Sequence, residues 1–223
     1  MRAVLFDLDG TLNDRVRSIS RFAEIFAADY GSQLGDVGVA ALTDAIRRAD
    51  RDGYRPKDES MAELLAILPW RSRPRLDELT AYWRAEFPKI NQPMEGLYST
   101  LGELRSRELK LGIVTNGNAR VQNAKIDALG IRTYMGTIIV SEAVGMKKPE
   151  PRIFELALRE LSATPAETWF VGDHPVNDIL GASAVGMNSV WLRGLIAWPD
   201  GQGEPKRQIR SLTELNSVLA ALT

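Results

Sequence analysis

Two aspartates near the N-terminus have the spacing of a reactive pair. In the segment LFDLDGTLND (5–14), Asp7 and Asp9 stand two positions apart, where an apolar run stops at Gly10. Side chains two apart in a strand lie on the same side, and Gly10 allows a sharp turn after them. Carboxylates this close repel each other and lose hydration on burial. A bound cation or a shared proton would relieve the repulsion, and two solvated acids at a strand end are the alternative.

Other polar residues that could take part in chemistry lie near the ends of later apolar runs. They are Thr115 and Asn116 at the end of LGIVT (111–115), Lys148 beside Pro149, and Asp173 and Asp178 after WFVG (169–172). Each pattern alone is typical of a turn, a solvated lysine or a helix cap. Their order along one sheet indicates a shared site, because sites in open parallel sheets form at the carboxyl ends of strands. A helix starting near Asn118 would present N–H groups suited to phosphate.

The chain from Pro93 onward alternates strands with helices. Apolar runs bounded by Gly, Asn or Asp indicate buried strands, as does the opening AVLFD; the later runs are 111–115, 137–140, 169–172 and 189–192. Amphipathic helices are expected between them, for example over 150–162, and a short strand and a helix near 212–222 close the chain. This alternation predicts the α/β class with a doubly wound, Rossmann-like parallel sheet.

Residues 14–92 show only helical periodicity, interrupted by breaker segments such as RDGYRPKDES (51–60). We expect about four helices there, inserted directly after the first strand. The predicted domains are therefore an α/β core of residues 1–13 and 93–223 and a small helical domain of residues 14–92.

The composition excludes several classes of function. The 223 residues carry a net charge of −1 and no cysteine, so there is neither an overall basic field for a nucleic acid polymer nor a thiolate site. No apolar stretch approaches the roughly 20 residues that span a bilayer, and the N-terminus lacks the pattern of a secretory signal. We expect a soluble, cytoplasmic protein without a membrane partner.

The motifs DLDGTL, TNG, KKPEPRIF and GDHPVNDI, taken in this order, resemble the four motifs of the haloacid dehalogenase superfamily of phosphohydrolases. The resemblance covers essentially the whole chain, and the helical insertion resembles the cap of the first subfamily in position and helicity. True dehalogenases of the superfamily replace the second acid with a non-acid. Because this chain keeps Asp9, it resembles the members that transfer phosphoryl groups.

The resemblance implies a role for each matching residue. Asp7 would be the nucleophile that forms an aspartyl-phosphate, and Asp9 the general acid and base. Lys148 would neutralise developing charge and hold Asp7, while Thr115 and the Asn116 backbone would bind phosphate oxygens.

The implied cofactor is Mg²⁺. Its ligands would be the Asp7 carboxylate, the Asp9 backbone carbonyl, Asp173, waters and a phosphate oxygen, an all-oxygen shell that suits this ion. Asp178 would lie beside the metal or beside Lys148.

The implied function is a Mg²⁺-dependent phosphatase acting on a small phosphorylated metabolite. A phosphomutase uses the same two acids and needs a bisphosphate activator. A receiver-like phospho-acceptor module also combines strand-end acids with Mg²⁺ and a lysine, but it needs neither a helical insertion nor a leaving-group acid. Substrate identity and oligomeric state stay open.

Substrate contacts from the helical domain are a further hypothesis. Nine of its arginines are expected mostly on solvated helix faces: Arg15, Arg17, Arg47, Arg48, Arg51, Arg55, Arg71, Arg73 and Arg75. The polar loop around Tyr54, Arg55 and Lys57 is a candidate for contact with an anionic substrate. Asn13 is expected to face water, with contact to substrate as the alternative. His174, the single histidine, is expected to be structural, with a direct catalytic role as the alternative.

Overall fold

The computed structural model describes residues 1–53 and 55–220 and divides into two units. The first, the core unit, is Met1–Asp14 with Pro93–Thr223, and the second, the cap unit, is Arg15–Gln92. The division expected from the sequence lies one residue away at the first boundary and coincides at the second. No helix in the described ranges is long and apolar enough to cross a membrane.

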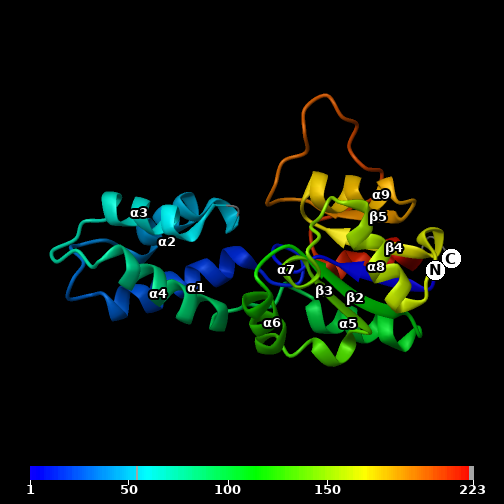
Figure 1. The fold of residues 1–223 in the computed structure, drawn as a ribbon, viewed down its shortest axis with the longest axis horizontal. Coiled ribbons are helices and arrows are strands. Elements are labelled where there is room, and N and C mark those ends of the chain that lie inside the picture. Colours follow the sequence, from blue (N-terminus) through cyan, green and yellow to red (C-terminus); the bar gives the residue numbers. More distant parts are fainter. Residues whose placement is uncertain (54, 221–223) are drawn as a thin grey trace. The chain divides into compact units, whose positions relative to one another are not determined.

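A parallel sheet of six strands, in the order β3-β2-β1-β4-β5-β6, forms the centre of the core unit (Figure 1). The strands are β1 (Ala3–Phe6), β2 (Lys110–Thr115), β3 (Thr137–Val140), β4 (Thr168–Gly172), β5 (Asn188–Leu192) and β6 (Gln208–Ile209). Every neighbouring pair is parallel; in the middle of the sheet Leu5 is in register with Gly112 on one side and Phe170 on the other. The doubly wound α/β class predicted from the sequence is confirmed.

Helices cover both faces of this sheet. They are α5 (Leu97–Ser106), α6 (Ala119–Ala128), α7 (Ser141–Val144), α8 (Pro151–Leu161), α9 (Gly181–Ala184) and α10 (Leu215–Ala220), with the short helical turns η3 (Arg132–Tyr134), η4 (Pro165–Glu167), η5 (Pro175–Leu180) and η6 (Leu212–Glu214). The helix expected near 212–222 starts later, at Leu215, because η6 precedes it with Ser211 capping the Thr213 N–H. Residues 221–223 lie outside the described ranges.

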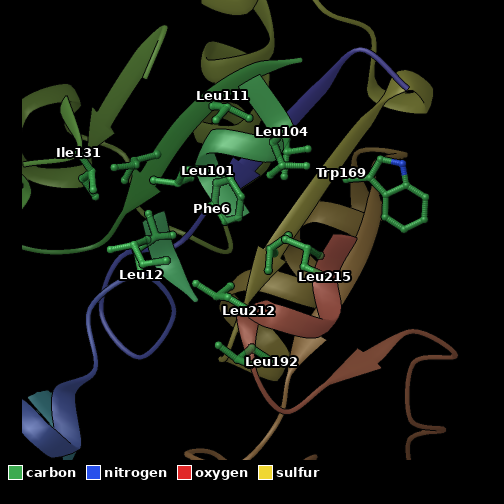
Figure 2. Close-up of a cluster of buried hydrophobic side chains, with 14 of the residues drawn as sticks. Phe6, Leu12, Leu101, Leu104, Leu111, Ile131, Trp169, Leu192, Leu212 and Leu215 are labelled. Atoms are coloured by element: carbon green, nitrogen blue, oxygen red, sulfur yellow. The ribbon is translucent and has the colours of Figure 1, made fainter. Parts of the chain in front are cut away.

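The pleat of β1 divides the core into two apolar layers. Val4 and Phe6 pack into a cluster with α5, α6 and α10, part of which Figure 2 shows around Phe6. Ala3 and Leu5 pack on the opposite face with α8 and α9. All four side chains are fully buried, so a strand covered on both faces has no polar side until it ends.

The strand order reverses at β1, which pairs with β2 on one side and β4 on the other. Reversal of the strand order leaves a crevice at the carboxyl ends of the two diverging strands. Asp7 follows β1 and Asp173 follows β4, so both acids lie at this edge of the sheet.

The cap unit consists of helices packed around aromatic side chains. Its α-helices are α1 (Arg15–Asp29), α2 (Val39–Asp50), α3 (Lys57–Ile67) and α4 (Leu76–Glu86), joined by the turns η1 (Arg51–Gly53) and η2 (Phe87–Lys89). Phe22 of α1 meets Trp83 of α4 edge to face at 4.7 Å between ring centroids, and Trp83 stacks on Phe87 at 4.5 Å. This apolar centre is separate from the two layers of the core unit.

Candidate active site

The turn after β1 places the first acids. The Asp7 N–H still donates to Val171 O of β4 at 2.9 Å, and the chain then turns so that the Leu12 and Asn13 N–H groups both donate to Leu8 O. Gly10 has a φ of 84°, a left-handed conformation, and a Cβ there would lie 2.4 Å from Asp173 Oδ2. Only glycine therefore allows this turn to pack against the Asp173 carboxylate.

Lys148 joins two of the predicted site acids. Its Nζ donates to Asp7 Oδ1 at 2.6 Å and to Asp178 Oδ1 at 2.7 Å, and all three side chains are buried. Burial alone would lower the pKa of Lys148, but the carboxylates of Asp178 and Asp7 outweigh it and raise that pKa. Lys148 is therefore a firmly charged ammonium at this edge of the sheet.

Asp7 itself is not fully compensated by that ammonium. Burial raises the pKa of Asp7 to about 7, against the opposing effect of Lys148 and with a further contribution from Asp178. A carboxylate with this environment needs additional positive charge to stay ionised at neutral pH.

Asp173 also needs additional positive charge to stay ionised at neutral pH. Burial, with the charges of Asp7 and Asp178 added, raises its pKa well above the usual value. Its Oδ1 is buried and has no hydrogen-bond partner in the part of the chain that the structure describes. The backbone behind it is fixed, because Trp191 Nε1 donates to Asp173 O at 2.9 Å.

These acids fit a divalent cation. Asp7, Asp173 and Asp178 each offer one carboxylate oxygen, and these oxygens lie within 4.8 Å of one another. An unpartnered buried oxygen, raised carboxyl pKa values and an all-oxygen donor set together suit a hard divalent cation. Asp178 also accepts the His174 N–H at 3.0 Å, so two of its contacts are already made within the protein.

Asp9 accepts hydrogen bonds from α6 and from Asn13. Its Oδ2 accepts from Lys125 Nζ at 2.6 Å and from Gln122 Nε2 at 3.0 Å, and its Oδ1 accepts from Asn13 Nδ2 at 3.0 Å. Asn13 is fully buried, so the expectation that it faces water is wrong. The turn that closes from Leu8 to Asn13 brings the Asn13 side chain back onto Asp9.

The end of β2 carries the residues predicted to bind phosphate. Thr115 is buried, and its Oγ1 accepts from Gln122 Nε2 at 2.7 Å. The Thr115 hydroxyl proton has no acceptor among the described residues and remains able to donate to an anion. The Asn116 side chain instead pairs with the Lys148 backbone, donating to Lys148 O at 2.9 Å and accepting from Lys148 N at 2.8 Å. Asn116 thus fixes the loop that carries Lys148.

His174 has a structural role, as expected. Its Nδ1 accepts the N–H groups of Val176 and Asn177 at 3.1 and 3.2 Å and so caps the π-helical turn η5. Burial lowers the pKa of His174, which keeps the ring neutral and able to accept these bonds.

Sequence reasoning missed Gln122 and Lys125, although a signal was present. Both are buried in α6, on the same side as Ile126 and Leu129. Spacings of three, four and seven residues put them on one helical face. Polar residues within an otherwise apolar stripe are a sign of buried partners, and here the partners are Asp9 and Thr115.

The candidate contact residues of the cap unit are held by salt bridges. Arg55 pairs with Glu63 of α3, and Lys57 pairs with Asp50 of α2. Tyr54, the third candidate, lies outside the described residues.

Comparison with known proteins identifies the family. Residues 4–192 match the family described as haloacid dehalogenase-like hydrolase. A glyceraldehyde 3-phosphate phosphatase of Methanopyrus kandleri is 31% identical over 197 residues, covering 86% of this chain and 84% of that protein. The haloacid dehalogenase-like hydrolase domain-containing protein 3 of Mus musculus is 41% identical over 217 residues, covering 87% and 82%.

Solved structures of this fold carry more than one chemistry. A 2-haloacid dehalogenase of Pseudomonas syringae pv. Tomato DC3000 superposes with a TM-score of 0.62 at 28% identity, with 100% of both chains covered. Phosphatases and dehalogenases are thus both similar to this chain, and the side chains of the site must decide between them. The sequence match over most of the chain establishes that this protein is an enzyme of the haloacid dehalogenase-like hydrolase family.

Proposed function

We propose that this hydrolase is a Mg²⁺-dependent phosphatase that hydrolyses a small phosphomonoester through an aspartyl-phosphate at Asp7. The observation that carries the proposal is the convergence of Asp7, Lys148 and Asp173 at one edge of the sheet, with Asp9 two residues from the nucleophile. The names of relatives, glyceraldehyde 3-phosphate phosphatase among them, support phosphate ester hydrolysis.

In the first half of the reaction, an Asp7 carboxylate oxygen attacks phosphorus. The bond from phosphorus to the leaving oxygen breaks, and Asp9 gives that oxygen a proton. Lys148, 2.6 Å from Asp7, offsets the negative charge that gathers on the phosphoryl oxygens. The Thr115 hydroxyl and the Asn116 backbone N–H donate to those oxygens.

In the second half, a water molecule attacks the phosphorus of the aspartyl-phosphate. Asp9, now a carboxylate, accepts a proton from this water, and the bond from phosphorus to the Asp7 oxygen breaks. Inorganic phosphate leaves and both acids return to their starting states. Asp9 must therefore exchange a proton at one carboxylate oxygen in both halves, which makes its hydrogen bonds to Lys125 and Asn13 part of the machinery.

Mg²⁺ would be held by Asp7, Asp173 and the backbone carbonyl of Asp9, with Asp178 held beside it by Lys148 and the His174 N–H. When bound, it supplies positive charge that keeps the carboxylates ionised and draws electron density from a phosphate oxygen. The raised pKa of Asp7 and of Asp173 is the local support for this assignment.

The expected partner is a small phosphorylated metabolite rather than a nucleic acid polymer or a membrane. The net charge of −1 gives no broad basic surface for a polymer. A cytoplasmic location stays a prediction from composition.

The test is hydrolysis of p-nitrophenyl phosphate by the purified protein with MgCl₂ and with EDTA. We expect release only with the metal, and we expect Asp7→Asn to lower kcat by on the order of 10⁴-fold or more, as loss of a nucleophile does. Circular dichroism checks that Asp7→Asn is folded.

A folded Asp7→Asn protein with near-normal turnover would contradict the assignment of Asp7 as the nucleophile. Metal-dependent phosphorylation without release would favour the receiver-like module, and a need for a bisphosphate activator would favour the mutase.

A further inference from the structure

Helix α6 of the core unit carries a buried glutamine that touches two segments of the candidate active site. Gln122 is 2% exposed, and its Nε2 donates to Asp9 Oδ2 at 3.0 Å and to Thr115 Oγ1 at 2.7 Å. Asp9 lies in the turn after β1, and Thr115 is the last residue of β2. One amide nitrogen therefore holds the proposed general acid and a proposed phosphate contact at the same time.

The partners of Gln122 fix which way its amide faces. The Asp9 carboxylate, which forms an ion pair with Lys125, can only accept hydrogen bonds, so the nitrogen of the amide must face it. The amide nitrogen has two hydrogens to donate, and Asp9 Oδ2 and Thr115 Oγ1 accept them. Turning the amide over would place two acceptors against each other at Asp9 and would remove the donor at Thr115.

The orientation of this amide decides where the Thr115 hydroxyl points. A hydroxyl has one proton, and because its oxygen accepts from Gln122, that proton must point away from Gln122 Nε2. Without the amide, the hydroxyl could instead turn toward an acceptor of the protein, such as the Asp9 carboxylate. A donor that is already aimed when an anion arrives needs no reorganisation, and this makes it effective in stabilising charge.

The first turn of α6 makes this hydroxyl more important. The sequence predicts that a helix starting near Asn118 offers its N–H groups to phosphate. Two of these groups have acceptors within the protein, since the Ala119 N–H donates to Glu142 Oε2 at 2.7 Å and the Val121 N–H donates to Asn118 Oδ1 at 3.1 Å. The proposed phosphate contact at the end of β2 therefore relies more on the Thr115 hydroxyl than on the start of the helix.

The loop after β2 leaves space for the glutamine. Gly117 has a φ of 148°, and a Cβ at this position would lie 3.0 Å from Cγ and Cδ of Gln122. A larger residue would push Gln122 away from Thr115. A buried amide is often only a satisfied polar group of the core. That explanation and a role in the site predict different effects on phosphate binding.

We propose that Gln122 is a positioning residue that, anchored on Asp9, aims the Thr115 hydroxyl at the phosphoryl group. The inference rests on the proposed phosphatase function and deepens it, because it assigns part of the phosphate affinity to a side chain that acts through Thr115. Lys125, on the same face of α6, donates to Asp9. Loss of Gln122 should therefore weaken phosphate binding, whereas loss of Lys125 should not.

The experiment is a double-mutant cycle that measures binding of inorganic phosphate. Isothermal titration calorimetry with MgCl₂ gives the Kd of the wild type, Thr115→Val, Gln122→Leu and the double variant. We expect Thr115→Val to raise Kd about tenfold, since it removes a hydrogen bond to a charged group, and Gln122→Leu to raise it about three- to tenfold. The double variant should have nearly the Kd of Thr115→Val, because both substitutions remove the same contact with phosphate.

Other variants of α6 separate positioning from stability. Asn123→Leu removes the same kind of amide at the next position, where Asn123 donates to Ala119 O and accepts from Arg132, and we expect the Kd of the wild type. Lys125→Met should also keep that Kd, while kcat for p-nitrophenyl phosphate falls. Gln122→Glu keeps the length of the side chain but removes the donor, so it should raise Kd even if Gln122→Leu does not fold. Thermal unfolding checks each variant.

Three outcomes overturn the proposal. They are an unchanged Kd in folded Gln122→Leu and Gln122→Glu, effects of Gln122→Leu and Thr115→Val that multiply in the double variant, and no binding of phosphate by the wild type. Hydrolysis of p-nitrophenyl phosphate with MgCl₂ distinguishes these failures from failure of the phosphatase function. A wild type that releases p-nitrophenol, with Gln122 variants that bind phosphate normally, contradicts the positioning role alone. Phosphate binding that depends on Gln122 without any hydrolysis contradicts the phosphatase function alone.

Discussion

Each unit of this protein buries charged side chains, but the two balance them differently. In the core unit, the carboxylates of Asp7, Asp173 and Asp178 gather around the single ammonium of Lys148. In the cap unit, the single carboxylate of Asp50 lies between the cations of Arg15 and Lys57. Three carboxylates of the core unit thus gather at one described ammonium, whereas the Asp50 carboxylate has two described cations.

The carboxyl pKa values express this difference. Burial raises the pKa of Asp7 and of Asp173, and one lysine does not compensate for it. Burial would also raise the pKa of Asp50, but Arg15 and Lys57 outweigh it and lower that pKa below 3.8. A buried acid with its own cations is a structural element, whereas the undercompensated acids of the core unit support the proposed cation site.

The largest stability effect is expected in the cap unit. Asp50→Asn removes the carboxylate and leaves Arg15 and Lys57 without their common partner. Since Asp50 is fully buried, we expect the free energy of unfolding to fall by about 3–5 kcal/mol, as for other buried ion pairs that lose one member. Urea unfolding followed by tryptophan fluorescence measures it.

The control is Asp58→Asn, which breaks the exposed pair with Arg84. Exposed pairs contribute little because solvent screens them, so we expect a change near the experimental error. If both variants lose the same stability, the Asp50 cluster is not the structural element described above.

Among the acids of the core unit, Asp9 resembles Asp50 in having a lysine as its own ion-pair partner. That partner is Lys125, whose ammonium offsets the negative charge of the Asp9 carboxylate. Lys125→Met should leave KM unchanged and lower kcat by about 10- to 100-fold, the order of loss that follows from a misplaced catalytic group. Lys110→Met, which removes only contacts to backbone carbonyls of residues 161 and 162, serves as the control. Steady-state kinetics that show a raised KM with normal kcat would place Lys125 in substrate binding instead.

Asp173→Asn should stabilise the metal-free protein, whereas Asp50→Asn should destabilise it. Without metal, it removes one of three crowded carboxylates and leaves the ion pairs of Lys148 intact, so we expect the free energy of unfolding to rise. The stabilisation that Mg²⁺ gives the wild type, about 2.7 kcal/mol at a hundred times Kd, should disappear. Thermal unfolding in EDTA and in MgCl₂ measures both effects, and a metal-dependent shift that survives in Asp173→Asn would contradict the proposed ligand set.

The smallest expected effect is a difference in pH dependence. In EDTA, Asp7 titrates at about 7 when folded and near 3.8 when unfolded, so the folded state holds more protons between these values. Stability of the metal-free protein should therefore fall as the pH rises from 4 to 7. The stability contribution of Asp50 depends on pH in the opposite direction. It is fully present above pH 3.8, the pKa of an unfolded aspartate, and is lost as the pH falls through the lower pKa of the folded state.

Urea unfolding in EDTA at several pH values tests this contrast. Asp7→Asn should flatten the slope between pH 4 and 7, and Asp50→Asn should remove the acid loss below pH 4. A wild-type stability that rises between pH 4 and 7 would show that Asp7 is compensated without metal.

Much of the fold and part of the site follow from local patterns in the chain. Apolar runs bounded by Gly, Asn or Asp predict the strands, and β1 to β5 were all expected within one residue of their observed starts, including Thr137–Val140. Asp7, Thr115 and Asp173 stand directly at strand ends, where the direction of a parallel sheet brings them to one edge. The roles assigned to these residues stay predictions.

What the chain itself determines is thus the set of elements and the acids at their ends, since hydrophobic period and glycine placement are local properties. The tertiary structure decides which polar groups from distant segments meet. Asp9 finds Lys125 more than a hundred residues away, and the Asn116 side chain holds the backbone of Lys148, 32 residues further along the chain. The same holds in the cap unit, where pairing with Asp50 and Glu63 engages Lys57 and Arg55, whereas the Arg47 Nε has no partner within the described ranges. Charge compensation depends on distance and burial in three dimensions, and neither can be obtained from residue spacing along the chain.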